Sequence, residues 1–351
     1  MGRHRFITAA ALSLALATIG VACGDDDGAD VRSFGDCGGS GNASGSASAS
    51  GSASGAATES GSAGSGSGSA SCPSGSGSGS GSGSESGAGS GSGIADEIAG
   101  SSTDNPLVTD AVAEYQVWVS EQVDQTIAAT ETFTDAVRAG DVEGAKAAYA
   151  PSRQGWERIE PIAGLVEEID GAVDARVDDF EGVDDPDFTG WHRLEYLLWK
   201  QGTTDGGAAF ADQLDADLQI LRAELVAMEI PPAALAVGSA ELIEEVSTGK
   251  ITGEEDRYSG TDLWDFAANV EGAEHGFALL GPAIEAEDAA LVSTIEGLFN
   301  ELDGQLEAYR DGEGYRPYGA LTDEHKTEMQ TTLAELSEHL ATVAGVLGLE
   351  G

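Results

Sequence analysis

After residue 104, hydrophobic and polar positions alternate with the three- and four-residue spacing of amphipathic helices. The first such stretch follows Asp104 or Asn105, either of which can cap a helix with Pro106 in its first turn. Its apolar positions are Val108, Val112, Tyr115, Val119, Val123 and Ile127. We therefore predict a helix that begins near Pro106 and ends before Gly140.

The same periodicity predicts further helices along the chain. A second helical region covers 142–150 and a third runs over 151–166, where Pro161 is expected to kink or interrupt it. The acidic segment 180–188 contains Pro186 and indicates a loop before the next helix. The remaining predicted helices cover about 207–229, 232–248, 260–287, 288–310 and 321–347. Since alternating β patterns and Asn-Gly turn signals are missing, we predict an all-α fold of antiparallel helices in one or two bundles.

The N-terminal part of the chain has a different composition. Residues 1–22 place Arg3, His4 and Arg5 before a mostly apolar run, which is the layout of a secretory signal peptide. From residue 38 to 93 the chain is almost wholly Gly, Ser and Ala, which bury too little apolar surface to offset the entropy of ordering. We therefore divide the chain into a signal peptide (1–22), a Gly/Ser-rich disordered tether (23–103) and a helical domain (104–351).

The three cysteines, Cys23, Cys37 and Cys72, all precede the helical domain, which therefore has no disulfide and no thiolate metal ligand of its own. The small residues before Cys23 resemble the lipobox of bacterial lipoproteins, although Gly20 stands where that motif usually has Leu. Processing there would make Cys23 a lipid anchor at the outer face of the cytoplasmic membrane. Ordinary cleavage, giving a soluble secreted protein, is the alternative, and both place the helical domain outside the cytoplasm.

The chain is strongly acidic, with 62 Asp and Glu against 16 Lys and Arg and a formal net charge of −46. Such a surface repels nucleic acid and anionic membranes and raises the local concentration of cations. We therefore expect no nucleic-acid partner. Salt adaptation or simple solubility explains the charge equally well.

The stretch at 189–199, TGWHRLEYLLW, carries the most specific chemistry in the helical domain. His192 and Glu195 stand three residues apart and so share one helix face, within an apolar run in which both are costly to bury unpaired. A metal ion is a partner that uses both. Arg193 and Tyr196 break the zinc-protease patterns HExxH and HxxEH, and a surface His–Glu pair or a buried histidine with satisfied hydrogen bonds remains the alternative.

Acidic residues on neighbouring segments extend this candidate site. Glu157 and Glu160 repeat the three-residue spacing, and Asp174, Asp178 and Asp179 precede the His192 helix. Inward-facing carboxylates with one histidine would favour hard cations. The predicted ligands are His192, Glu195, Glu157, Glu160 and Asp178. In the competing interpretation Glu157 pairs with Arg153 one turn away, and Asp178 only caps or solvates a loop.

Four blocks of the helical domain resemble one protein family. They are AYAPSRQGWERIEPIAGL (148–165), DARVDDF (174–180), TGWHRLEYLLW (189–199) and KITGEEDRYSGTDLWDFAANVEGA (250–273). In this order they resemble the imelysin family, specifically the EfeO/EfeM-type iron-uptake lipoproteins. The resemblance implies an extracytoplasmic, all-helical protein that binds iron and works with a high-affinity iron permease and a haem peroxidase. The family's Gly-x-His-x-x-Glu motif falls on Gly190, His192 and Glu195.

Two features of the resemblance leave alternatives open. Many EfeO-type proteins carry an N-terminal cupredoxin domain, whereas the Gly/Ser tether stands there in this chain, as in the single-domain EfeM arrangement. In the last block, Glu254, Glu255 and Asp256 offer further ligands or a second cation site. In the other interpretation Ser259 or Thr261 simply caps the next helix, and Trp264 and Phe266 fill the core.

Our hypothesis is a tethered protein that binds ferric or ferrous iron, or another divalent cation, and passes it to a permease without transforming it. The alternative is an imelysin-like metal-dependent peptidase, in which His192 and Glu195 would hold zinc with an activated water. The incomplete protease motif and the lack of a clear general base weigh against it. Binding of a metal-laden acidic polysaccharide is a third possibility, disfavoured by the negative charge unless cations bridge the two.

Overall fold

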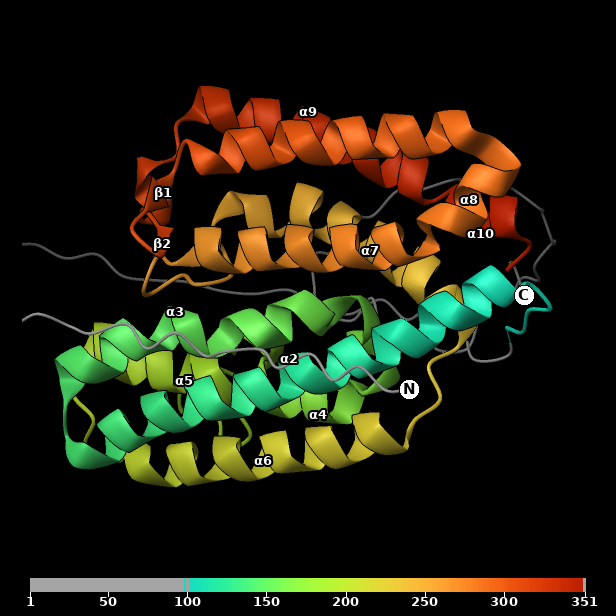
Figure 1. The fold of residues 1–351 in the computed structure, drawn as a ribbon. Coiled ribbons are helices and arrows are strands. Elements are labelled where there is room, and N and C mark those ends of the chain that lie inside the picture. Colours follow the sequence, from blue (N-terminus) through green and yellow to red (C-terminus); the bar gives the residue numbers. More distant parts are fainter. Residues whose placement is uncertain (1–97, 99–100, 350–351) are drawn as a thin grey trace, which may run out of the picture. The chain divides into compact units, whose positions relative to one another are not determined.

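A computed structural model describes residue 98 and residues 101–349 of the chain. The predicted signal peptide, the three cysteines and nearly all of the predicted tether lie outside these residues. The described part is helical, with two very short strands, which confirms the predicted all-α class (Figure 1). Among the described residues, none of the helices is both long and apolar enough to cross a membrane.

The first long helix, α2 (Pro106–Ala139), has the bounds that the sequence predicts. The side chain of Asn105 accepts a hydrogen bond from the backbone N–H of Leu107 at 3.0 Å, and Pro106 stands in the first turn. Gly140 ends the helix in the left-handed conformation, with φ 76°. Its buried face includes Val108, Tyr115 and Val119, in line with the periodicity.

The next helix, α3 (Val142–Ile159), runs straight through Pro151, so the predicted boundary between 142–150 and 151–166 is wrong. Proline removes one backbone hydrogen bond, but Tyr149 and Trp156 are fully buried on either side of it, and this burial offsets the loss. Pro161 has the predicted effect, because the α-helix gives way there to the 3-10 segment η1 (Glu160–Leu165). The following α4 (Glu167–Val173) is too short for periodicity to predict.

A loop that contains the 3-10 turn η2 (Val177–Asp179) leads to α5 (Gly190–Tyr196). One π-helical turn, η3 (Leu197–Gln201), continues α5, and α6 (Gly207–Ala227) and α7 (Pro232–Thr248) follow. The 3-10 turn η4 (Lys250–Thr252) precedes the longest helix, α8 (Asp262–Glu307).

Helix α8 is broken by a kink at Asp288, whose φ of −148° and ψ of 86° are not helical, and this kink confirms the predicted junction between the helices at 260–287 and 288–310. The helix predicted at 288–310 ends earlier than predicted, at Glu307. The residues after it form a two-stranded hairpin of β1 (Arg310–Asp311) and β2 (Gly314–Tyr315). Asp311 pairs with Gly314, so the two-residue loop is Gly312-Glu313, and a glycine with φ 64° at the first loop position is a hairpin signal. After η5 (Tyr318–Ala320), the helix predicted at 321–347 divides into α9 (Asp323–Leu340) and α10 (Val343–Leu347).

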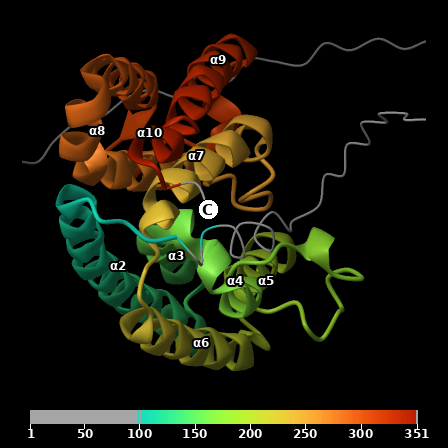
Figure 2. The same ribbon diagram turned by 90° about the vertical axis from the view of Figure 1, so that its right-hand side faces the viewer.

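The helices pack in two groups that share α8 (Figures 1 and 2). Helices α2, α3 and α6 pack together with the short α4 and α5, and α7, α8 and α9 form the second group. The N-terminal part of α8 also packs against α3. A Cβ on Gly272 would lie 2.0 Å from the carbonyl oxygen of Arg158, so the two backbones touch there. This close crossing places Asp265 and Asn269 of α8 beside Arg153 and Glu157 of α3.

Candidate metal centre

Helix α5 is fixed at its first residue. Gly190 has φ 72°, and a Cβ there would lie 2.1 Å from the carbonyl oxygen of Val173 at the end of α4. The hydroxyl of Thr189 also donates to the carbonyl of Ala172 at 2.9 Å. The start of α5 is therefore held directly against α4, and the helix carries His192 and Glu195 into the interior, where they are 2% and 0% exposed.

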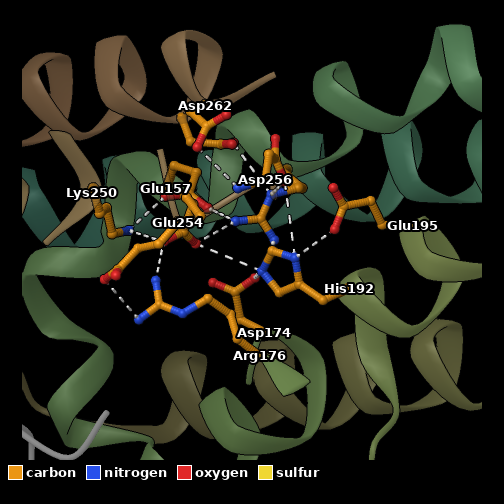
Figure 3. A network of polar contacts seen from close by, with 12 residues as sticks. Glu157, Asp174, Arg176, His192, Glu195, Lys250, Glu254, Asp256 and Asp262 are labelled. Carbon is orange, nitrogen blue, oxygen red and sulfur yellow. Dashed lines mark hydrogen bonds and ion pairs between the residues drawn. The ribbon is translucent and has the colours of Figure 1, made fainter. Parts of the chain in front are cut away.

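The imidazole of His192 has carboxylates at both ring nitrogens (Figure 3). Glu195 Oε2 lies 3.4 Å and Asp256 Oδ1 3.9 Å from Nδ1, and we call these three residues the Nδ1 group. Asp174 Oδ1 lies 3.5 Å and Glu255 Oε1 3.7 Å from Nε2, and these form the Nε2 group with the same histidine. Within each group, one ligand atom per residue lies within 4.8 Å of the others.

Backbone amides and hydroxyls orient the acids of the Nδ1 group. Glu195 Oε1 accepts from the amides of Tyr258 and Ser259 at 2.9 and 2.7 Å. The hydroxyl of Tyr149 donates to Asp256 Oδ1 at 2.8 Å and lies 3.3 Å from His192 Nδ1, while the hydroxyl of Thr261 donates to Asp256 Oδ2. Thr261 stands at the N-cap position of α8, but its hydroxyl bonds Asp256 and does not accept from a backbone N–H of the helix.

The Nε2 group already contains a cation. The guanidinium of Arg153, which is 0% exposed, donates through Nη1 to Asp174 and through Nη2 to Glu255 Oε1, the latter at 3.0 Å. Nη1 also lies 3.3 Å from His192 Nε2. From the same side chain Nη2 donates to Glu157, and Nε lies 3.3 Å from Asp265 Oδ1.

The predicted ligands Glu157 and Glu160 lie in a neighbouring ion cluster. Lys250 Nζ, buried, contacts Glu157 Oε2 at 3.1 Å and Glu160 at 2.6 Å, and the amide of Asn269 donates to both carboxylates. Neither acid belongs to the two groups that contain His192. Glu157 also pairs with Arg153, which was the competing interpretation of its spacing.

The predicted ligand Asp178 lies at the surface. Its side chain is 63% exposed and pairs with Arg257. The structure therefore brings His192 and Glu195 together and places the other three predicted ligands in ion pairs elsewhere. Their role as ligands stays a prediction.

Sequence reasoning did not select the three acids nearest to His192 besides Glu195. Asp174 was noted only as preceding the helix, and Glu255 and Asp256 only as possible additional ligands. Tyr149 and Lys250, which complete the network, were not singled out. The sequence feature that could have identified Glu255 and Asp256 is their place in the run Glu254-Glu255-Asp256, inside the longest block that resembles the family.

The network shifts the pKa of several groups. Burial and Arg153 both favour neutral His192, but its hydrogen bonds to Glu195 and Glu255 and the charge of Asp174 outweigh them and raise its pKa to about 9. For Asp174 and Glu255, burial is outweighed by neighbouring cations, mainly Arg153 and Lys250 respectively, and the pKa of each is lowered. Burial and the adjacent Asp256 raise the pKa of Asp265, and raise that of Asp262 to about 7.

The donor set fits a hard or borderline cation such as iron, because it combines one imidazole with carboxylates and contains no thiolate. Acids also outnumber cations in this buried region. Its acids are Glu157, Glu195, Glu255, Asp256, Asp262 and Asp265, whereas its buried cations are Arg153 and Lys250, next to His192. Protonation offsets part of this excess, because the raised pKa values favour neutral Asp262 and Asp265 and charged His192.

Fold and centre together define an all-helical protein with a buried histidine–carboxylate cluster at the meeting of α3, α5 and the segment before α8. Residues 111–343 match the family model of imelysin, and the chain belongs to the imelysin family. It is 47% identical over 257 residues to the "Iron uptake system component EfeO" of Yersinia pseudotuberculosis, covering 73% of this chain and 69% of that protein.

The protein of the same printed name from Escherichia coli O157:H7 is 45% identical over 241 residues, covering 68% of this chain and 64% of its own length. These matches confirm the family resemblance that the four sequence blocks indicated.

Proposed function

We propose that this chain is an iron-binding component of an iron-uptake system and holds iron at the Nδ1 group. The observation that carries the proposal is the buried imidazole with two buried carboxylates beside Nδ1, each oriented by hydrogen bonds from backbone amides or hydroxyls. The names of the relatives, which are iron-uptake components, support iron as the cargo.

Electrostatics favours Nδ1 over Nε2. A metal ion in the Nε2 group would lie next to the guanidinium of Arg153, and two cations at that distance repel strongly in a buried site. With Nδ1 engaged by the ion, the Nε2 proton would be donated to Asp174 or Glu255. A carboxylate behind the ligating histidine in this way fixes the ring and raises its basicity.

The wider ligand set predicted from sequence would require rearrangement. Glu157 and Glu160 would reach an ion at His192 only after release from Lys250 and Arg153, and Asp178 only after leaving Arg257. We therefore propose His192, Glu195 and Asp256 as the ligands. Glu157 and Glu160 then keep the two buried cations in place.

Burial also favours a carrier over a peptidase. His192, Glu195 and Asp256 are at most 2% exposed, so a peptide bond has no direct access to them, whereas a single ion needs a much smaller opening. In this proposal the chain works outside the cytoplasm, anchored through Cys23, and hands iron to a permease in a system that includes a haem peroxidase. These partners and the anchor follow from the family resemblance and remain predictions.

Isothermal titration of the protein with Fe²⁺ under anaerobic conditions tests the proposal. We expect the double variant His192→Ala, Glu195→Ala to lose measurable binding, because it removes two of three ligands. The matched control is Glu335→Ala, His339→Ala on α9, which removes the same residue types outside the cluster and should bind like the parent protein. Unchanged affinity in the first variant would sink the site assignment.

Digestion of a peptide library with and without a chelator tests the alternative function. A carrier yields no metal-dependent cleavage products. Cleavage that disappears with the chelator, and in the His192→Ala, Glu195→Ala variant, would replace the carrier proposal with the peptidase.

A further inference from the structure

Arg153 occupies a place in the network that a ligand set alone does not explain. We propose that its guanidinium is the resident cation of the Nε2 group, which keeps a metal ion out of that group and restricts His192 to one ion at Nδ1. The exclusion of metal from the Nε2 group concerns Arg153 alone, whereas the binding of one ion at Nδ1 rests on the proposed function.

Arg153 lies where an ion would bind the two acids of the Nε2 group, and it approaches His192 without replacing the proton on Nε2. Nη1 bonds Asp174 and lies 3.3 Å from His192 Nε2, and Nη2 bonds Glu255 at 3.0 Å. One side chain thus contacts all three members of the group. Its approach to the Nδ1 group is weaker, since Nε lies 3.8 Å from Asp256 Oδ1 and no contact with Glu195 is among those of the described residues.

The position of Arg153 is fixed on the other side as well. Glu157 accepts from Nη2, and Asp265 faces Nε, so the guanidinium is held between α3 and α8 as well as against His192. The side chain is fully buried. Leaving the Nε2 group would therefore break contacts with five carboxylates and strand a charge in the interior.

An arginine closes the Nε2 group in a way that other residues would not. A lysine or a protonated carboxylic acid at the position of Arg153 could lose its proton, and the resulting lone pair or negative charge would allow a metal ion to bind. The guanidinium stays charged at any pH at which the protein is folded, and its planar fork matches two carboxylates at once. The Nε2 acids are thus permanently engaged, and the Nδ1 acids remain available.

The test counts Mn²⁺ ions bound per chain by equilibrium dialysis. Arg153→Gln alone leaves the surrounding acids unbalanced and can fail to fold, so the decisive variant is Arg153→Gln, Glu157→Gln, which removes one buried charge of each sign. We expect one ion in the parent protein and one in Glu157→Gln. In the charge-balanced double variant we expect two ions, with the Nε2 proton of His192 released to solvent so that the ring bridges both ions as an imidazolate. Adding Asp174→Asn and Glu255→Gln to that variant should return the count to one.

A folded charge-balanced variant that still binds one ion with the parent's affinity would overturn the inference. So would a second ion that persists after Asp174→Asn and Glu255→Gln. If the parent protein binds no metal, the proposed function fails, whereas the gain of one ion that depends on Asp174 and Glu255 would still support the role of Arg153.

A measurement on the unmodified chain decides the question if the variants do not fold. Imidazole ¹⁵N chemical shifts, recorded while Zn²⁺ is added, report which ring nitrogen of His192 binds metal. We expect Nδ1 to shift and Nε2 to keep its proton. Metal at Nε2 would show that Arg153 leaves the group, contrary to the inference.

Discussion

At the residue scale, Asp170 is an acid whose surroundings in the fold disfavour its charged form. Burial, with the nearby charge of Asp174, raises its pKa to about 7 in spite of Lys250. An unfolded chain has Asp near a pKa of about 3.9. The folded state therefore binds the proton more tightly, and this contribution to stability is complete below about pH 4 and is lost as the pH rises through 7.

The variant Asp170→Asn removes this dependence because the amide does not titrate. We expect the free energy of unfolding of the parent protein to fall more steeply between pH 5 and pH 8 than that of the variant, by at most about 1.4 kcal/mol per pH unit. Urea titrations at both pH values measure it, with exposed Asp110→Asn as the control. Parallel pH profiles for parent and variant would contradict the raised pKa.

At this scale the sequence predicted contacts within one helix and missed those between helices. The three-residue spacing of His192 and Glu195 and the four-residue spacing of Arg153 and Glu157 both correspond to contacts in the structure. Asp256 reaches His192 from a segment far along the chain, and no spacing rule contains that pairing. The acids around His192 were therefore visible as candidates but could not be ordered by proximity.

Helix α5 depends, at the element scale, on the one residue that starts it. Gly190 has a positive φ and lies so close to Val173 that a methyl group would overlap its carbonyl oxygen. We expect Gly190→Ala to destabilise the protein by more than about 1 kcal/mol and to weaken metal binding, because α5 must shift to make room. Thermal unfolding and Fe²⁺ titration measure the two effects.

Gly171→Ala in α4 is the matched control. A Cβ at Gly171 meets nothing within 4 Å, and its φ is not positive, so alanine should be neutral or slightly stabilising in that helix. Equal behaviour of the two alanine variants would mean that the contact between α4 and α5 does not position His192.

Element boundaries were predictable where a local signal set them. Asn105, Pro106 and Gly140 fix the ends of α2, and Pro161 ends α3. Pro151 misleads, because tertiary packing carries α3 through the proline, whereas the predicted junction between residues 287 and 288 coincides with the kink of α8 at Asp288. The hairpin after α8 was missed although Gly312 begins its two-residue loop, because the helical period of the preceding residues dominated the prediction.

At the scale of the whole molecule, acidic residues outnumber basic residues, as they do in the buried cluster around His192. The full chain carries a net charge of −46, and its described part contains a buried cluster with more acidic than basic residues. A negative field of this size concentrates cations near the surface. If iron is the cargo, surface and centre therefore act in sequence, the first raising the local ion concentration and the second binding one ion.

Salt separates these two contributions. Raising the ionic strength from 0.01 M to 1 M shortens the screening length from about 30 Å to about 3 Å, so the surface field should vanish, while a buried ion is screened far less. We expect the association rate of Mn²⁺, followed by stopped-flow tryptophan fluorescence, to fall at least about tenfold with added NaCl, while the dissociation rate changes little. The expectation applies where binding of the ion limits the rate, and an observed rate proportional to the Mn²⁺ concentration verifies that condition. An association rate independent of salt would assign the surface charge to solubility alone.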